Sequence, residues 1–211
     1  MKQLRKLLKE YPLLITWIST AGNLIYAGIH LLLGASDTSY WHITMSTYFL
    51  ILGLLRLAAG TAGRKQPEKI MRVCGFGIIL LSIVLCGVSV LVIRYRINPS
   101  YHRNIMLAYA AYSFILITAA VINVIKARVL DDTNFRTIRH LSLVSAIGVM
   151  LAMERAMLGT YGIPEDSFTV KIEAGTGGFA AVTVLLAGIH LILTARRKKE
   201  ERLKDYEEQR I

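Results

Sequence analysis

The sequence predicts an all-α fold, a polytopic membrane protein built as one bundle of six transmembrane helices. The 211 residues are 54% hydrophobic, and their mean hydropathy is +0.48. The apolar residues form long blocks, and six of these blocks reach about the ~20 residues that a transmembrane helix needs. Lys and Arg gather in the short segments between the blocks, as they do in membrane proteins. These observations favour membrane spans over one large soluble core.

The first half of the chain contains signals for three spans. Residues 1–10 are basic with an apolar stripe, which is typical of a segment that lies along a membrane surface. The first span begins at Pro12, because proline suits the first turn of a helix, and the polar turn 34–39 ends it. The aromatic pair at 40–41 opens the second span at a membrane interface. A basic loop at 64–69 then leads to the third span.

Longer connections separate the spans of the second half. The basic linker 94–104 precedes the fourth span, the charged segment 126–139 precedes the fifth, and the polar segment 161–171 leads to the sixth. We therefore expect a single domain over residues 1–211, with spans at about 12–34, 42–63, 73–93, 105–125, 140–160 and 174–195 and a charged tail at 196–211.

The distribution of positive charge predicts the orientation of this bundle. Six spans place both termini on one side, and nineteen Lys and Arg residues lie on that side against four on the other. Because basic loops stay in the cytoplasm, both termini are predicted to be cytoplasmic, in the plasma membrane of a cell. The net charge of +11 does not indicate nucleic-acid binding, since no soluble domain is available to present a basic face.

The fifth span, within residues 139–162, contains two charged residues, Glu154 and Arg155. A charge at the centre of a transmembrane helix costs at least ~2.5–3.5 kcal/mol, so these side chains need partners, water or a ligand. Glu154 and Arg155 are adjacent and point about 100° apart around the helix, so they do not face each other.

A rise of about 1.5 Å per residue sorts the polar residues of the spans by depth. Arg56 falls within ~10 Å of the cytoplasmic face and Glu154 within ~10 Å of the outer face, too far apart for a direct ion pair. The predicted outer polar layer contains His30, Arg94, Glu154, Arg155 and Glu173. The predicted inner polar layer contains Arg56, Asn123 and His190.

Two hypotheses account for Glu154. It is either a proton or cation site that faces the outside, or one half of a structural ion pair with Arg94. For Arg56, close to an interface, we expect a snorkelling or packing role. The glycine-rich stretch 174–178 opens the sixth span, and close helix packing accounts for it better than anion binding, because no P-loop Lys-Ser/Thr follows. The same packing role is expected for Gly53, Gly60, Gly87 and Gly188.

Other classes of site find little support in the residue pattern. His30 and His190 lack partners at metal-ligand spacing, so neither a metal nor a cofactor is expected. Glu154 is the single acid inside a predicted span, which argues against two-carboxylate catalysis. The sequence therefore favours a protein that is not an enzyme.

Three segments carry a resemblance to a known group of proteins. They are SYWHITMSTYFLILGLLR, AYAAYSFILITAAVINVIKAR and LSLVSAIGVMLAMERAMLGTYG. Together they resemble uncharacterised small six-span membrane proteins of Gram-positive bacteria over residues 39–162. The resemblance implies the fold class and a bacterial plasma membrane, and it implies no activity. Glu154 matches the pattern of the group, whereas a small residue often stands at the position of Arg155.

Two functions remain open from the sequence. The first is binding or passage of a small solute or ion through the outer polar layer, with the lipid bilayer as the surrounding partner. The second is a non-transporting interaction or regulatory subunit that joins a membrane partner or a second copy of the chain. Six spans and cytoplasmic termini also resemble the substrate-capturing subunits of energy-coupling-factor transporters, although Ala21 and Ala27 do not have the alanine spacing of their docking helices.

Overall fold

The described part of the chain is all-helical and contains no strand. The structure, a computed structural model, describes residues 12–37, 39–63, 65–95, 99–129, 133–161 and 167–208. Its helices are α2 (Pro12–Asp37), α3 (Tyr40–Thr61), α4 (Pro67–Tyr95), α5 (Arg103–Val129), α6 (Thr133–Tyr161) and α7 (Ser167–Glu208). The predicted all-helical fold is confirmed.

The helices have the length and composition that a bilayer requires. Five of them, namely α2, α3, α4, α6 and α7, are long and apolar enough to cross a membrane. In α5 the apolar segment found within the described residues is shorter and covers Met106–Thr118. Large apolar side chains also lie on the outside of the bundle, with Leu107 and Phe179 both 75% exposed. Soluble proteins rarely expose so much apolar surface, so this fold is compatible with a membrane helical bundle.

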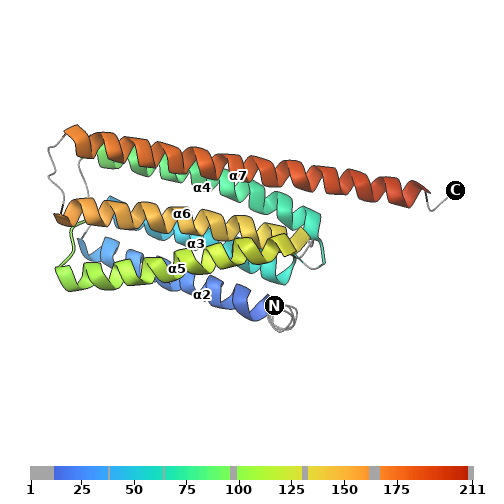
Figure 1. Cartoon of the computed structure of the whole chain (residues 1–211), viewed down its shortest axis with the longest axis horizontal. Coiled ribbons are helices and arrows are strands. Elements are labelled where there is room, and N and C mark those ends of the chain that lie inside the picture. Colours follow the sequence, from blue (N-terminus) through green and yellow to red (C-terminus); the bar gives the residue numbers. More distant parts are fainter. Residues whose placement is uncertain are drawn as a thin grey trace.

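The helices lie in layers across the bundle (Figure 1). Helices α4 and α7 make the most extensive contact and form one edge, α3 and α6 lie in the middle, and α2 and α5 form the other edge. Consecutive helices run in opposite directions, so α2 begins and α7 ends at the same end of the bundle (Figure 1). Helix α7 continues past that end of the bundle.

The helix bounds differ from the expected ones mainly at α4, α6 and α7, and α6 begins at Thr133 instead of 140. Helix α4 begins at Pro67, where proline fits a first turn and Glu68 complements the positive end of the helix dipole. Helix α7 begins at Ser167 instead of 174, because the segment up to 173 contains neither proline nor glycine. It also continues through the charged tail to Glu208, since Lys, Arg and Glu are good helix formers.

Close helix contact at glycines brings α4 and α7 together. A Cβ atom added to Gly75 would lie 3.1 Å from the backbone oxygen of Gly188, and one added to Gly188 would lie 3.0 Å from the backbone oxygen of Gly75. The predicted packing role is therefore confirmed at Gly188, and also at Gly53, where an added Cβ would meet Leu24 at 2.8 Å. It is wrong at Gly87, where the space is open.

Candidate functional site

A buried ion pair joins α6 to α7 in the half of the bundle where these two helices are connected. The Nη1 atom of Arg155 lies 3.4 Å from Oε1 of Glu173, and the two side chains are 0% and 1% exposed. The Nη2 atom of Arg155 also donates a hydrogen bond to the backbone oxygen of Glu173 at 2.6 Å. Each charge therefore has its main partner inside the protein, which offsets part of the cost of removing both from water.

Gly177 makes room for this pair. A Cβ atom on Gly177 would lie 2.7 Å from Cβ of Ser89 on α4 and 3.1 Å from Nη2 of Arg155. The absence of a side chain lets α7 approach α4 closely while the guanidinium group passes between them. The packing interpretation of the glycine-rich stretch therefore holds at Gly177, whereas Gly175 and Gly178 face open space.

Glu154 lies on a different side of α6 from Arg155 and is half-buried. Its Oε1 atom accepts a hydrogen bond from Oγ1 of Thr176 at 2.8 Å. In the described part of the chain it forms no ion pair, and Arg94 is exposed in the last turn of α4. The hypothesis of a Glu154–Arg94 pair is therefore wrong, because Glu173 provides the buried ion pair of this region to Arg155.

Glu154 and Thr176 line a groove of about 830 Å³ between three helices. Residues of α6 form its floor, and residues of α5 and α7 form its walls. Apart from Glu154 and the hydroxyls of Thr176 and Thr183, the lining is apolar, and its large flexible or aromatic members are Phe114, Met150, Met153, Met157 and Phe179. This groove is the candidate functional site.

His30 belongs to a separate cluster, which we name the His–Tyr cluster. It consists of Tyr26, His30, His42, Tyr101 and Tyr109, from α2, α3, α5 and the segment before α5. The ring of His30 lies 4.5 Å from that of Tyr26 and 5.4 Å from that of His42. His42 Nε2 and the hydroxyl of Tyr101 form a hydrogen bond of 2.8 Å. The structure thus divides the predicted outer layer, since the observed ring partners of His30 are Tyr26 on its own helix and His42 and Tyr109 on α3 and α5.

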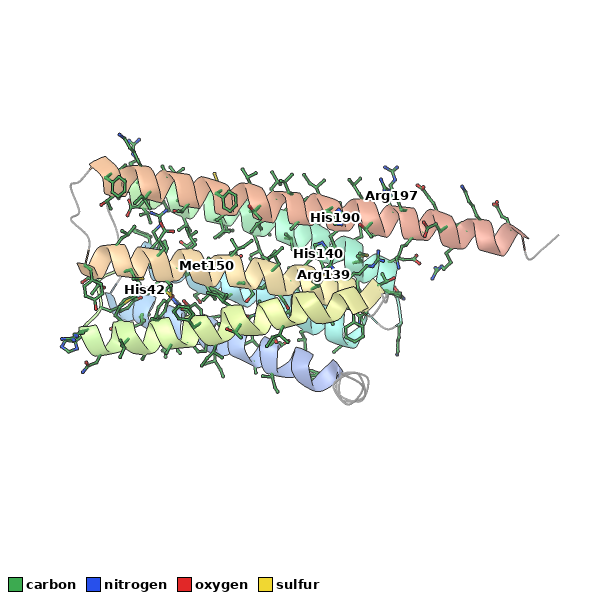
Figure 2. The ribbon with its side chains drawn as sticks, in the orientation of Figure 1. His42, Arg139, His140, Met150, His190 and Arg197 are labelled. Carbon is green, nitrogen blue, oxygen red and sulfur yellow. The ribbon has the colours of Figure 1, made fainter. Side chains whose placement is uncertain are left out.

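The predicted inner layer is also divided. Arg56 is 4% exposed, so it is buried rather than snorkelling, and its Nη2 donates to the backbone oxygen of Leu141 at 3.4 Å and to Ser142 Oγ at 3.3 Å. His190 is exposed and stacks on His140 at 5.5 Å (Figure 2). The side chain of Asn123 lies outside the described residues.

Figure 2 shows that the His–Tyr cluster and the groove lie at a different position along the bundle from the stacked pair of His140 and His190. His42 and Met150 are labelled in one half, and His140 and His190 in the other. Sequence reasoning missed His42, whose place in the sequence indicated only an interfacial residue, and the tyrosines of the His–Tyr cluster. The spacing of Tyr26 and His30, four residues apart on one helix face, is the signal that indicates this cluster.

The site provides one carboxylate in an apolar setting rather than a set of metal ligands. Among the described residues, no three His, Cys, Asp or Glu side chains come together as a metal site would require. The fold and the groove define a helical bundle that is compatible with a membrane. Neither a protein-family model nor a curated protein matches the chain.

Proposed function

We propose that the chain is a six-span integral protein of the cell membrane, with cytoplasmic termini, which binds a lipophilic organic cation in the groove beside Glu154. The ligand is an amphipathic molecule with an apolar body and a positively charged amine or phosphonium-like centre. This is the small-solute function expected from the sequence, narrowed by the chemistry of the groove. The observation that supports it most is a carboxylate without an ion-pair partner in an apolar groove.

The balance of charge supports a cationic ligand. The charge of Arg155 is matched by Glu173 at 3.4 Å, and their shared hydrogen bond further commits Arg155 to Glu173. Glu154 then adds a further negative charge. Among the described residues, its partner is the hydroxyl of Thr176, and no cationic side chain forms an ion pair with it. Because a charge inside a membrane is costly, a bound cation would lower the free energy of this site.

The lining of the groove suits a ligand with a bulky apolar body. Met150, Met153 and Met157 are flexible and polarisable, so they adapt to ligands of different shape. Phe114 and Phe179 provide aromatic rings, which attract cations through their π faces. The volume of about 830 Å³ lies within the ~300–1,000 Å³ that small-molecule sites usually occupy.

The route to the site runs from the side of the bundle. Phe114 is 63% exposed and Phe179 is 75% exposed, so the groove walls border the surface that lipid would contact. A ligand that first dissolves in the bilayer therefore reaches Glu154 without crossing the packed core. An amphipathic cation concentrates in the membrane for the same reason, because its apolar body favours lipid.

The first test uses tetraphenylphosphonium as the probe, with binding measured by isothermal calorimetry on the purified protein in detergent. Glu154→Gln should weaken binding by about tenfold or more, because it removes the one charged side chain among the described lining residues of the groove. Glu207→Gln, which removes an exposed acid of α7 far along the chain, is the matched control and should bind as the wild type does.

The stability of the variant separates loss of binding from loss of structure. Glu154→Gln should unfold at the same temperature as the wild type or slightly higher, because a neutral amide costs less than a charge at this depth. Equal binding of tetraphenylphosphonium by the wild type and Glu154→Gln would contradict the proposal. So would a wild type that binds no tetraphenylphosphonium at all.

The orientation is tested by cysteine labelling in cells. With the two native cysteines, Cys74 and Cys86, replaced, single cysteines at 37 and 165 should react with an impermeant maleimide from outside intact cells. Cysteines at 66, 134 and 210 should react only after permeabilisation, because the basic segments stay in the cytoplasm. Labelling of position 66 in intact cells would reverse the proposed topology.

A second candidate function is that of an interaction or regulatory subunit, including a substrate-capturing subunit of a transporter. It is favoured by α7, which continues as a charged helix past the end of the bundle (Figure 1). Such a helix offers a surface for another protein without disturbing the packed core. A partner that co-purifies with the full chain, and is lost when the charges of α7 after residue 200 are replaced, would favour this candidate over binding alone.

A further inference from the structure

A basic hollow lies at the end of the bundle where α4 begins and α7 leaves the other helices. Its volume is about 450 Å³, and its basic lining residues are Lys65, Lys69, Arg72, Lys199 and Arg202. We name it the basic hollow. Among the described lining residues, Glu68 is the single acid. Residues of two segments far apart in sequence therefore bring five positive charges and one negative charge to one concave surface.

Contacts on both sides hold the α7 wall of the basic hollow in place. The Nζ atom of Lys198 donates a hydrogen bond to Oγ1 of Thr133 at 3.0 Å, which fastens α7 to the start of α6. Arg202 Nη1 lies 3.5 Å from Oε1 of Glu68, which fastens α7 to the first turn of α4. The backbone that presents the basic side chains is thus positioned by the fold.

The described residues balance only part of the charge of the basic hollow. Glu68 offsets Arg202, while the other four basic lining residues form no ion pair in the described part of the chain. These four charges face the same concave space and repel one another, so an anion placed there would be attracted by all of them. An anion with two or more charges gains most from such an arrangement.

The position of the basic hollow along α7 matches the boundary of the apolar region. Ala195 is fully buried among the other helices, and Lys199 follows one helical turn later. Lipid phosphates lie at such a boundary when a helix crosses a membrane, and basic residues there bind anionic head groups. The same place is open to a soluble phosphate compound from the aqueous side.

We infer that the basic hollow is a binding site for a phosphate-bearing anion with at least two negative charges. The phosphate chemistry is common to two sources, an anionic lipid head group and a soluble phosphate compound. The site is independent of the groove at Glu154, because it lies at the other end of α7 and shares no residue with it.

The experiment measures the unfolding temperature of the full chain in detergent against increasing concentrations of two probes. Cardiolipin, added to the micelles, tests the lipid source, with phosphatidylcholine as the neutral control. Inorganic pyrophosphate tests the soluble source. A ligand that binds only the folded protein raises the unfolding temperature, and the concentration dependence gives an apparent affinity.

Two double variants of equal charge identify the site. Lys69→Gln/Lys199→Gln removes two positive charges from the basic hollow, and Lys171→Gln/Lys204→Gln removes two from exposed positions outside it. Each basic side chain near an anionic partner contributes about fivefold to affinity, so the first variant should bind about thirtyfold more weakly. The second should bind within about twofold of the wild type.

The outcomes are distinct. Stabilisation by cardiolipin alone supports a lipid head group, and stabilisation by pyrophosphate, with or without cardiolipin, supports a soluble source. In either case the stabilisation must be lost in Lys69→Gln/Lys199→Gln and kept in Lys171→Gln/Lys204→Gln. No stabilisation by either probe, or equal loss in both variants, would overturn the inference. Glu154→Gln should still be stabilised by the phosphate probe. If the basic hollow binds no phosphate, the proposed cation site at Glu154 is therefore not contradicted.

Discussion

Replacing Arg155 with methionine is expected to lower the free energy of unfolding by about 3–5 kcal/mol. Methionine fills a similar volume but leaves the carboxylate of Glu173 buried without its cation, and Glu173 is only 1% exposed. Breaking one side of a buried ion pair costs more than removing the whole pair, because a buried charge is left uncompensated. Unfolding of the purified protein in detergent, followed by circular dichroism, measures the loss.

A double-mutant cycle shows whether this loss belongs to the pair. Arg155→Met/Glu173→Leu removes both charges and should recover part of the stability lost in the single variant. The second single variant of the cycle, Glu173→Leu, should cost less than Arg155→Met, because the backbone oxygen of residue 173 still accepts the hydrogen bond from Arg155. Losses of the two single substitutions that simply add in the double variant would show that the pair does not couple α6 to α7.

The same measurement distinguishes the two neighbouring charges of α6. Arg155 is fully buried and paired, whereas Glu154 is half-buried at the groove and has a hydroxyl partner. We therefore expect a large loss of stability at Arg155 and almost none at Glu154→Gln. Such a difference in stability between the two variants would assign a structural role to Arg155 and leave Glu154 available for a ligand.

The fold could be predicted from the sequence because its signals are local. Six apolar blocks, separated by basic or proline- and glycine-containing segments, indicate the helices directly, and Pro12 and Pro67 stand at helix starts. The beginning of α7 at Ser167 could not be predicted from hydropathy, because polar and charged residues alternate with apolar ones in the first turns of this helix. A charged tail that continues a helix has the same composition as a solvated loop.

For the candidate site, the sequence predicts at which depth in the membrane the charged residues lie, but not which of them contact each other. Counting residues placed Glu154, Arg155 and Glu173 at one level, and the structure brings Arg155 and Glu173 together. The choice of partner depends on the rotation of each helix and on which helices are neighbours, and a single sequence determines neither. For this reason Arg94 was expected beside Glu154, and His30 was assigned to a charged layer instead of to the His–Tyr cluster.

The glycines also show that a single sequence does not determine which face of a helix packs against a neighbour. Gly87 and Gly188 occupy apolar blocks of similar composition, yet only Gly188 faces a neighbouring helix at close range. A glycine that packs and a glycine that faces open space cannot be distinguished until the helix faces are known. Gly177 differs again, since its neighbours are Ser89 of α4 and the guanidinium group of the buried pair.

Gly188→Leu is expected to lower the free energy of unfolding by about 3 kcal/mol or more, since overpacking typically costs ~1–3 kcal/mol even for smaller additions. The first added atom would already lie 2.8 Å from Cγ1 of Ile79, 3.0 Å from the backbone oxygen of Gly75 and 3.1 Å from the backbone nitrogen of Ile79. Two of these neighbours are backbone atoms, which cannot turn away as a side chain can. The helices α4 and α7 would have to separate, and they make the largest contact in the bundle.

Gly178→Leu on the same helix provides the matched control. A Cβ atom at Gly178 meets nothing within 4 Å, so the leucine has room and the helix gains the better propensity of leucine over glycine, worth up to ~1 kcal/mol. The control should therefore be as stable as the wild type or more stable, when both variants are unfolded by heat in the same detergent. If the two leucines lower stability equally, the close approach of α4 and α7 at Gly188 does not hold the bundle together.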